Sequence, residues 1–254
     1  ESRGLGDVYK RQNFTNTILS TYGTEFYRKA THGEGFIRGF FNVIKSATTG
    51  TGAALERLFI TGVSPVTMDD VTSGFNIGTN ITNDSWFNDL VGFSENELRE
   101  MLEYYKEQGV LQESIDEIVA MMKPNYDNYC FSEDTLEQCM FNSDMALYFL
   151  KSFVLHHKKP KEIVDPNIRT DFNKLAYLIK LDHGLGENFS VIKEIAEQGE
   201  IITDIVTHFS ALEMTDPSNF KSLLFYFGLL SIKGVDMVLS LIHISEPTRL
   251  DVIS

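Results

Sequence analysis

The spacing of apolar residues predicts a helix in the first part of the chain. Over residues 13–47 apolar side chains recur at a nearly helical period, at Phe36, Phe40, Val43 and Ile44. The glycine-containing segment TTGTG, at 48–52, interrupts this pattern. We therefore expect a helix that ends at these glycines.

Two short segments beyond the glycines have the composition of strands. The run LERLFITGV, at 55–63, is apolar, rich in β-forming residues at its centre and flanked by glycine, which predicts a buried strand. TNITND, at 79–84, is a second strand candidate.

The clearest local signal is the segment GFSENELREMLEYY, at 92–105. Ser94 and Glu97 have the spacing of a capping box, in which each side chain accepts a hydrogen bond from a backbone N–H at the helix start. Phe93 and Leu98 occupy the positions of a hydrophobic staple over this start. The segment predicts an amphipathic helix whose apolar stripe consists of Leu98, Met101, Leu102 and Tyr105.

The rest of the pattern is mostly helical, so the fold class predicted for the chain is mainly α with some β. The expected elements are helices at about 112–122, 143–157 and 190–198, a helix that starts at Thr170, a strand at 201–209, and a helix that Asp216 caps and Pro217 begins.

The two ends of the chain are related through the genetic code. With one permitted codon for each residue, the DNA strand opposite to the one that encodes ESRGLGDVYKRQ, at 1–12, encodes LSLIHISEPTRL, at 239–250, without a mismatch. Folding gives no reason for this relation, whereas the DNA resembles a transposase mosaic end with an adapter ligated to both ends of a fragment. We interpret 1–12 and 239–254 as adapter artefacts and exclude them from fold prediction. Residues 13–238 are then expected to be cut from a longer gene.

The chain is acidic, with 22 Lys and Arg against 36 Asp and Glu and a formal net charge of −14. The two terminal segments carry equal numbers of acidic and basic side chains, so residues 13–238 have the same net charge. Such a charge opposes binding of phosphate backbones through bulk electrostatics. The dense basic segment HHKKPK, at 156–161, fits cations at the end of a helix.

The apolar runs and the cysteines indicate the cellular compartment of the protein and whether it contacts a membrane. No apolar run reaches the length of a membrane span, so we expect a cytoplasmic protein with no membrane partner. Cys130 and Cys139 have no metal-ligating neighbours at the usual spacings. We expect both to be reduced thiols in a reducing compartment, and a disulfide between them is the alternative.

Groups with catalytic or metal-binding potential form no recognisable motif. The glycines of TTGTGAAL follow a helix and precede a strand, which is the reverse of a phosphate-binding loop, and the Lys of such a loop is absent. Asp69 and Asp70 are candidates for a divalent metal, but helix capping is the preferred interpretation. His156 and His157 diverge on a helix and cannot share one metal. His183 precedes Gly184 at a predicted helix end, so we expect no metal site and no catalytic triad.

Two hydroxyl groups follow the predicted buried strand, in the segment ITGVSP. Ligands of open α/β sheets lie beyond the carboxyl ends of strands, where the hydroxyls of Thr61 and Ser64 can orient a water or contact a phosphate. By pattern alone the simpler interpretation is favoured, in which Thr61 fills the strand and Ser64 starts a turn before Pro65.

Several longer segments resemble a known family. NFTNTIL, THGEGFIRGFFNVIKSAT, LFITGVSPVTMDDVTSGFNIGTNIT and GFSENELREMLEYY are similar to predicted AAA-ATPase-like proteins of anaerobic gut bacteria. The similarity continues through YDNYCFSED, MALYFL, VDPNIRTDFNKL and NFKSLLFYFGLLSI, and it covers nearly all of residues 13–238. LFITGVSPVTMDDVTSGFNI is long and specific.

The resemblance implies an α/β P-loop NTPase whose Walker A loop and Walker B strand precede NFTNTIL. It also implies, for many members, a restriction-endonuclease-like domain after GLLSI. On this basis we expect 13–91 to be the C-terminal part of the ATPase core, 92–185 a helical lid and 186–238 a helical connecting region. LFITGVS would be the sensor strand, with Thr61 and Ser64 facing the γ-phosphate. Arg57, which opens that strand, and Arg38 would be candidate arginine fingers.

We therefore expect a fragment of a cytoplasmic bacterial ATPase with Thr61, Ser64 and Arg57 as its nucleotide-binding residues. ATP and magnesium are the implied cofactors of the parent protein. A second copy of the chain and nucleic acid, through the nuclease-like domain, are the implied partners. Because Walker A and Walker B are missing, we expect the fragment alone to bind no cofactor and to hydrolyse no ATP. The alternative is a non-catalytic helical protein-interaction module.

Overall fold

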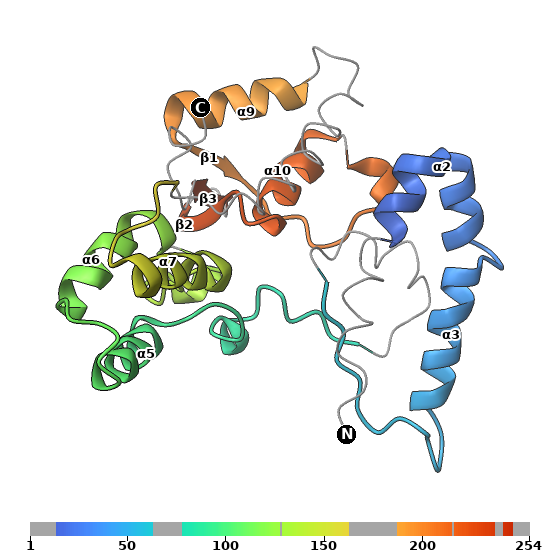
Figure 1. Cartoon of the computed structure of the whole chain (residues 1–254). Helices are drawn as coiled ribbons and strands as arrows, with labels where there is room; N and C mark the ends of the chain where they lie inside the picture. Colours follow the sequence, from blue (N-terminus) through green and yellow to red (C-terminus); the bar gives the residue numbers. More distant parts are fainter. Residues whose placement is uncertain are drawn as a thin grey trace. The chain divides into compact units, whose positions relative to one another are not determined.

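The computed structural model describes residues 14–62, 78–127, 129–162, 187–214, 216–236 and 241–245 (Figure 1). Contacts between backbone positions divide the chain into two compact units. The first consists of Glu1–Asn80 and Val206–Phe227, and the second of Ile81–Ile205 and Gly228–Ser254. Most of the described elements are helices, which agrees with the predicted mainly α class.

The first unit begins with two helices where the sequence predicted one. Helix α2 spans Phe14–Thr31 and is kinked at Gly23, whose φ of 78° is not helical. Helix α3 spans Phe36–Thr48. The segment between them, HGEG, contains two glycines, and Gly33 has a φ of 58°. The break has a local cause, since glycine favours left-handed backbone and weakens helices.

The α2–α3 turn is held together by close backbone contact. A Cβ at Gly35 would lie 2.3 Å from the carbonyl oxygen of Ala30, so only glycine fits there. Tyr27 and Thr31 are fully buried, and the Thr31 hydroxyl donates to the Tyr27 carbonyl over 2.9 Å. The prediction that α3 ends at TTGTG is confirmed, because its last residue is Thr48 and Gly50 adopts a φ of 96°.

The predicted buried strand at 55–63 is wrong over the part that the structure describes. Residues 55–62 form no strand and are exposed, with Phe59 at 64% and Ile60 at 42% of their full accessibility. A strand is stable only when neighbouring strands satisfy its backbone hydrogen bonds. Among the described residues, the strands that pair in a sheet all belong to the second unit.

The prediction of a second strand at 79–84 is also wrong, since none of these residues is in a strand. Its end forms a turn that leads into the 3₁₀ helix η1, Ser85–Phe87. The Asp84 carboxylate accepts a hydrogen bond from the Trp86 N–H over 2.9 Å. Aspartate and asparagine side chains compete with strand pairing in this way, and here they outweigh the β-branched residues.

The C-terminal part of the first unit contains helix α10, Pro217–Tyr226, and the 3₁₀ helix η3, Ala211–Glu213. Asp216 caps α10 and Pro217 begins it, as predicted. The buried Ser222 hydroxyl accepts from the Val206 N–H over 2.9 Å, and the Tyr226 hydroxyl donates to the Val206 carbonyl over 3.2 Å. These two contacts fasten the segment before η3 to α10.

The second unit is built on three helices. Helix α5 spans Glu95–Glu107, α6 spans Ile115–Tyr126 and α7 spans Ser143–His156. They agree with the predicted helices to within a few residues, and the capping box of Ser94 and Glu97 is present. Their apolar faces enclose one core, the α5–α7 core, of Leu98, Leu102, Leu111, Ile118, Val119, Met122, Tyr126, Phe141, Met145, Ala146, Phe149, Leu150 and Phe153.

A short antiparallel contact joins the starts of α5 and α7. Phe93 and Phe141 exchange backbone hydrogen bonds of 2.9 and 2.7 Å. Gly92 lies against this contact with a φ of 94°, and a Cβ there would lie 2.8 Å from the Phe141 carbonyl oxygen. The 3₁₀ helix η2, Glu133–Thr135, lies between α6 and α7 in the sequence.

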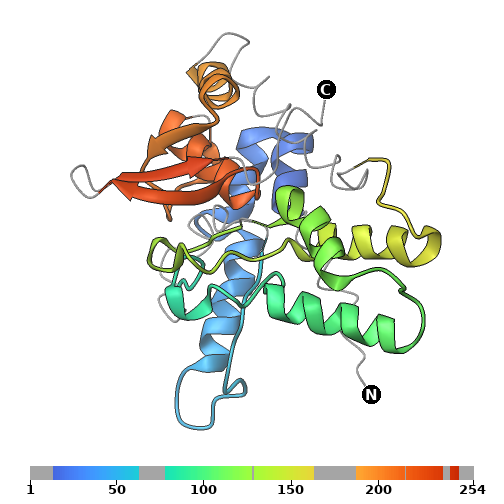
Figure 2. The same cartoon turned by 90° about the vertical axis from the view of Figure 1, so that its left-hand side faces the viewer.

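A three-stranded antiparallel sheet completes the second unit. Strands β1, Glu200–Thr203, and β2, Ser231–Asp236, both pair with β3, Leu241–Ser245, so the strand order is β1-β3-β2 (Figures 1 and 2). Helix α9, Glu187–Gln198, was predicted from residue 190 and leads into β1 through Gly199. The predicted strand at 201–209 is confirmed only in its first part.

The middle strand β3 lies within the terminal segment that we excluded from fold prediction. Its sequence, LIHIS, alternates and contains two β-branched isoleucines, which suits a strand whatever its origin. Ile244 is fully buried and pairs with Ile201 on one side and Ile232 on the other. The structure thus places 241–245 in the sheet, and the adapter origin of this segment stays a prediction.

The helix predicted from Thr170 lies outside the described residues. Within the described ranges, none of the helices is long and apolar enough to cross a membrane.

If Ile244 anchors the sheet, Ile244→Ala should lower the free energy of unfolding by about 3 kcal/mol, since it leaves a cavity between two neighbouring strands. Urea denaturation followed by circular dichroism measures the change. Ile202→Ala on β1 is the matched control, because Ile202 is 43% exposed and should cost less than about 1 kcal/mol. Equal losses in the two variants would show that β3 does not hold the sheet.

Candidate functional site

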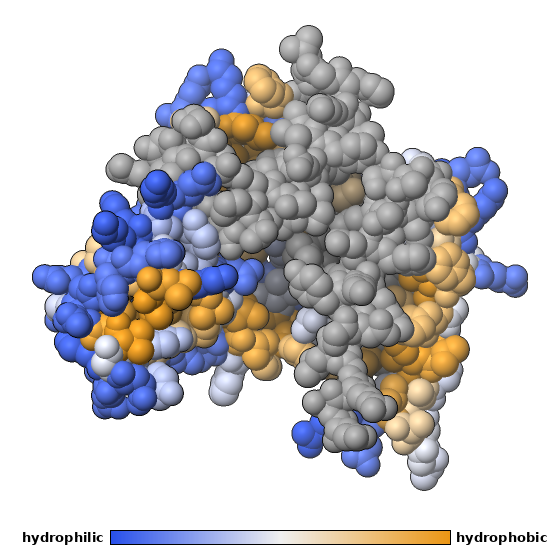
Figure 3. Space-filling model, in the orientation of Figure 1, coloured by the Kyte–Doolittle hydropathy of each residue, from blue (hydrophilic) through white to orange (hydrophobic). Residues whose placement is uncertain are grey.

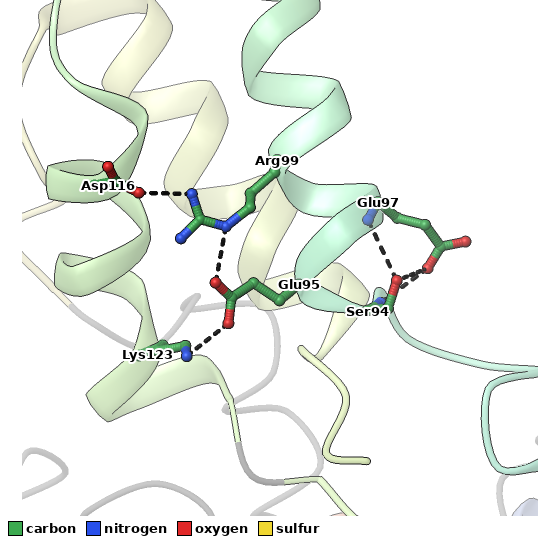
Figure 4. A network of polar contacts seen from close by, with 6 residues as sticks. All are labelled: Ser94, Glu95, Glu97, Arg99, Asp116 and Lys123. Carbon is green, nitrogen blue, oxygen red and sulfur yellow. Dashed lines mark hydrogen bonds and ion pairs between the residues drawn. The ribbon is translucent and has the colours of Figure 1, made fainter.

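Four charged side chains join helices α5 and α6 in the second unit, and we name them the α5–α6 charge network (Figure 4). Glu95 accepts from the Arg99 Nε over 2.8 Å and from the Lys123 Nζ over 2.6 Å. The second arm of the Arg99 guanidinium donates to Asp116 over 2.7 Å. The network is therefore a continuous chain in which acidic and basic groups alternate.

The sequence positions explain why these groups meet. Glu95 and Arg99 are four residues apart on α5, and Asp116 and Lys123 are seven apart on α6, so each pair lies on one helix face. Glu95 is also the first residue of α5, where the helix dipole favours a carboxylate. The two faces come together because the α5–α7 core lies beneath them.

The electrostatics of the network indicate a structural role. Hydrogen bonds from Lys123 and then Arg99 lower the pKa of Glu95. The bond to Glu95 raises the pKa of Lys123, and the bonds to Asp116 and Glu95 raise that of Arg99. The pKa values of Glu95, Arg99 and Lys123 are thus all shifted further from pH 7. A general acid or base instead needs a pKa near the working pH. The network is thus suited to fastening α5 to α6 and not to proton transfer.

The residues predicted to bind nucleotide lie in the first unit. Arg57 and Thr61 both belong to the exposed, non-helical segment 55–62, and Ser64 lies outside the described residues. Arg38, the other candidate arginine finger, lies on α3 and is half-buried. The described residues bring Arg57 and Thr61 onto one accessible segment. The placement of their side chains beside a nucleotide stays a prediction.

The remaining candidates are the aspartates and histidines that were considered as metal ligands. Asp69, Asp70 and His183 lie outside the described residues. His157 ends α7 in a left-handed conformation with a φ of 51°, which confirms that HHKKPK begins at a helix end. Its Nδ1 lies 3.6 Å from a Glu113 carboxylate oxygen. Within the described ranges, no group of three or more His, Cys, Asp or Glu side chains is arranged to hold a metal.

One face of α3 carries large apolar side chains that solvent reaches. Phe36 is 56% exposed, Phe40 53% and Val43 69%, and Figure 3 shows apolar surface along this helix. The predicted helical stripe is therefore present, but it is not buried. Leu55 and Leu58 in the following segment are exposed as well. This segment and α3 thus present large apolar side chains to solvent within the described residues.

Sequence reasoning missed two polar features of the second unit. One is the α5–α6 charge network, whose links between helices join residues distant in sequence. The other is Asn88, which is 2% exposed, accepts from the Phe131 N–H over 3.1 Å and donates to the Gln138 carbonyl over 2.9 Å. Neither has a local signal, although Glu95 and Arg99 have the spacing of an ion pair within one helix.

The lowered pKa values of Glu95 and Glu97 make stability depend on pH. A carboxylate with a lowered folded-state pKa stabilises the fold above its unfolded-state pKa, of about 4.3, and loses that contribution as the pH falls. We expect Glu95→Gln to lower the urea midpoint at neutral pH and to match the unsubstituted chain near pH 2, where the carboxylate of Glu95 is protonated in both states.

The control is Glu100→Gln, which neutralises an exposed glutamate on the same helix. It should change the midpoint much less at neutral pH. A Glu95→Gln defect of constant size from neutral to acidic pH would show that packing, and not charge, explains the effect.

Comparison with known proteins gives one match. Residues 7–72 match the model of the family described as predicted AAA-ATPase. No curated protein and no solved structure is significantly similar to the chain. The matched range begins at Asp7, inside the first terminal dodecapeptide. It contains α2, α3 and all three predicted nucleotide-binding residues, so the match supports an AAA-ATPase-like relation for this N-terminal part of the chain.

Proposed function

We propose that this chain is part of an AAA-like ATPase and that residues 55–64 belong to its nucleotide site. The family match carries the proposal, because it spans Arg57, Thr61 and Ser64 together with the two helices before them. In this proposal the parent protein binds and hydrolyses ATP in the cytoplasm of a bacterium.

The exposed apolar surface of the first unit supports this proposal. Core strands of parallel α/β sheets are buried on both faces and covered by helices. The segment 55–62 has the composition of such a strand, and α3 has the apolar face of a helix that covers a sheet. Both are exposed among the described residues, so their apolar groups are available to pack against further elements of a parent protein.

Arg57 and Thr61 fit a phosphate better than a metal. A guanidinium can donate two parallel hydrogen bonds to phosphate oxygens, which suits Arg57 to a developing negative charge. The Thr61 hydroxyl can both donate and accept, so it can orient an attacking water. Both side chains are exposed, and neither offers the carboxylate that magnesium prefers. ATP and magnesium would therefore depend on upstream motifs for most of their contacts.

The remaining parts of the parent follow from the same proposal. The α5–α7 core belongs to the helical lid at 92–185, and residues 186–238 connect it to a nuclease-like domain that would contact nucleic acid. Residues 1–12 and 239–254 are adapter artefacts in this proposal. A second copy of the chain would complete the site if Arg57 or Arg38 acts on a neighbouring nucleotide.

A non-catalytic interaction module is the second candidate. The observation that favours it is the α3 face of Phe36, Phe40 and Val43, which offers a helix-shaped apolar surface to a partner. In that case Thr61 and Arg57 have no role in catalysis.

Phosphate release separates the two candidates. We expect no ATP turnover by the 254-residue chain, and turnover by a chain extended upstream in the source gene. In the extended chain, Thr61→Ala should lower kcat about 10- to 100-fold, which corresponds to one hydrogen bond to a charged group.

Thr51→Ala is the matched control, since Thr51 is an exposed threonine in the glycine turn after α3 and should leave kcat unchanged. Equal turnover by the two threonine variants would remove Thr61 from the site. An extended chain that folds without any ATP turnover would favour the interaction module.

A further inference from the structure

We propose that Cys130 and Cys139 form a site of reversible thiol modification, at which a low-molecular-weight disulfide such as glutathione disulfide oxidises the two thiols to an intramolecular disulfide. Both are free thiols in the structure. They enclose the loop 131–138, which contains η2 and connects α6 to α7.

The backbone places the two cysteines opposite each other. Tyr129 and Met140 exchange hydrogen bonds of 3.2 and 2.9 Å, as in a hydrogen-bonded antiparallel pair. Cys130 and Cys139 are the next residues inward from this pair, and beyond them Phe131 and Gln138 are bridged by the Asn88 side chain. Antiparallel partners have Cα separations of about 4.5–5.5 Å, and disulfides span about 4.4–6.8 Å, so residues next to a bridged pair are within reach of a disulfide.

The contacts of Cys130 with β2 support this register. The Cys130 N–H donates to the Ser231 hydroxyl over 2.7 Å, and the Cys130 carbonyl accepts from the Ile232 N–H over 3.5 Å. The polar backbone groups of Cys130 thus face β2 and not Cys139. That is the arrangement of a non-hydrogen-bonded pair, in which the two side chains lie on the same face.

Both sulfur atoms are directed toward the loop they enclose. The Cys130 Sγ donates to the Ser132 carbonyl over 3.0 Å, and the Cys139 Sγ donates to the Leu136 carbonyl over 3.6 Å. Burial raises the pKa of Cys139 to about 11, and proximity to the Cys130 thiol contributes to the rise. The two thiols therefore share one local environment.

The loop is anchored before any disulfide forms. Buried Asn88 binds both the Phe131 N–H and the Gln138 carbonyl, which are the residues adjacent to the two cysteines. The Ser132 hydroxyl accepts from the Asp134 N–H at the start of η2. Closure then requires rotation of two side chains and little backbone movement, which favours intramolecular over intermolecular reaction.

The oxidation of the two thiols needs glutathione disulfide as its only added reagent. The thiolate of Cys139, the more exposed thiol, attacks one sulfur of glutathione disulfide, breaks that S–S bond and releases a glutathione thiolate. The Cys130 thiolate next attacks the Cys139 sulfur of the mixed disulfide and releases the second glutathione thiolate. The two protons lost by the cysteines pass to the two released thiolates. One disulfide is formed and one is reduced.

The test uses the full 254-residue chain and glutathione disulfide at about pH 9.5, because burial raises the pKa of both thiols and less thiolate is present at lower pH. After alkylation of the remaining thiols and proteolysis, mass spectrometry should find the Cys130 and Cys139 peptides linked, with the loss of two hydrogen atoms. Dithiothreitol should reverse the link. The ratio of this link to mixed disulfides should be about tenfold or more higher in the folded chain than in concentrated urea, since folding holds the thiols together.

Two serine variants test the order of the steps. Cys130→Ser should accumulate a glutathione adduct on Cys139, because the resolving thiol is gone. Cys139→Ser should react much more slowly, since Cys130 is 1% exposed. Circular dichroism confirms that both variants are folded. Stable mixed disulfides in the unsubstituted chain, a link that forms only in urea, or disulfide-bonded dimers would each overturn the proposal.

Discussion

The second unit depends on the burial of apolar side chains between α5, α6 and α7. Leu98 and Leu102 from α5, Ile118 and Met122 from α6 and Phe149 from α7 are almost completely removed from water. Burial of this kind contributes about 1.5–3 kcal/mol for each large side chain, which is more than an exposed ion pair provides. The α5–α6 charge network is therefore a consequence of the core. It fixes how two helices meet after the hydrophobic contact has brought them together.

In the first unit the same kind of apolar surface stays largely exposed among the described residues. Helix α3 has a well-formed apolar stripe, and the segment after it has the composition of an inner strand, yet both expose large apolar groups. The free energy that would order such elements comes from neighbours. Composition indicates the environment that a segment suits, while the structure shows the environment that it has.

Local features were predictable because their causes lie within a few residues. The capping box at Ser94, the Asp216 cap and the helix end at TTGTG all involve groups less than one or two turns apart. The strand at 55–63 failed because pairing depends on distant residues, and the break at HGEG was missed because the apolar period continues across it. Asn88 and Ser231 hold distant segments together, and such contacts have no sequence signal. The predicted site residues rested on a family resemblance, which the match over residues 7–72 supports.

The order of the strands also determines when the sheet can form. Within the described residues, β1 and β2 each pair with β3 and not with each other. During synthesis, β1 and β2 therefore leave the ribosome as separate segments and cannot form the sheet before β3. The three helices of the core are complete long before that point. This unit would fold in two stages, the helices first and the sheet only once β3 has been made.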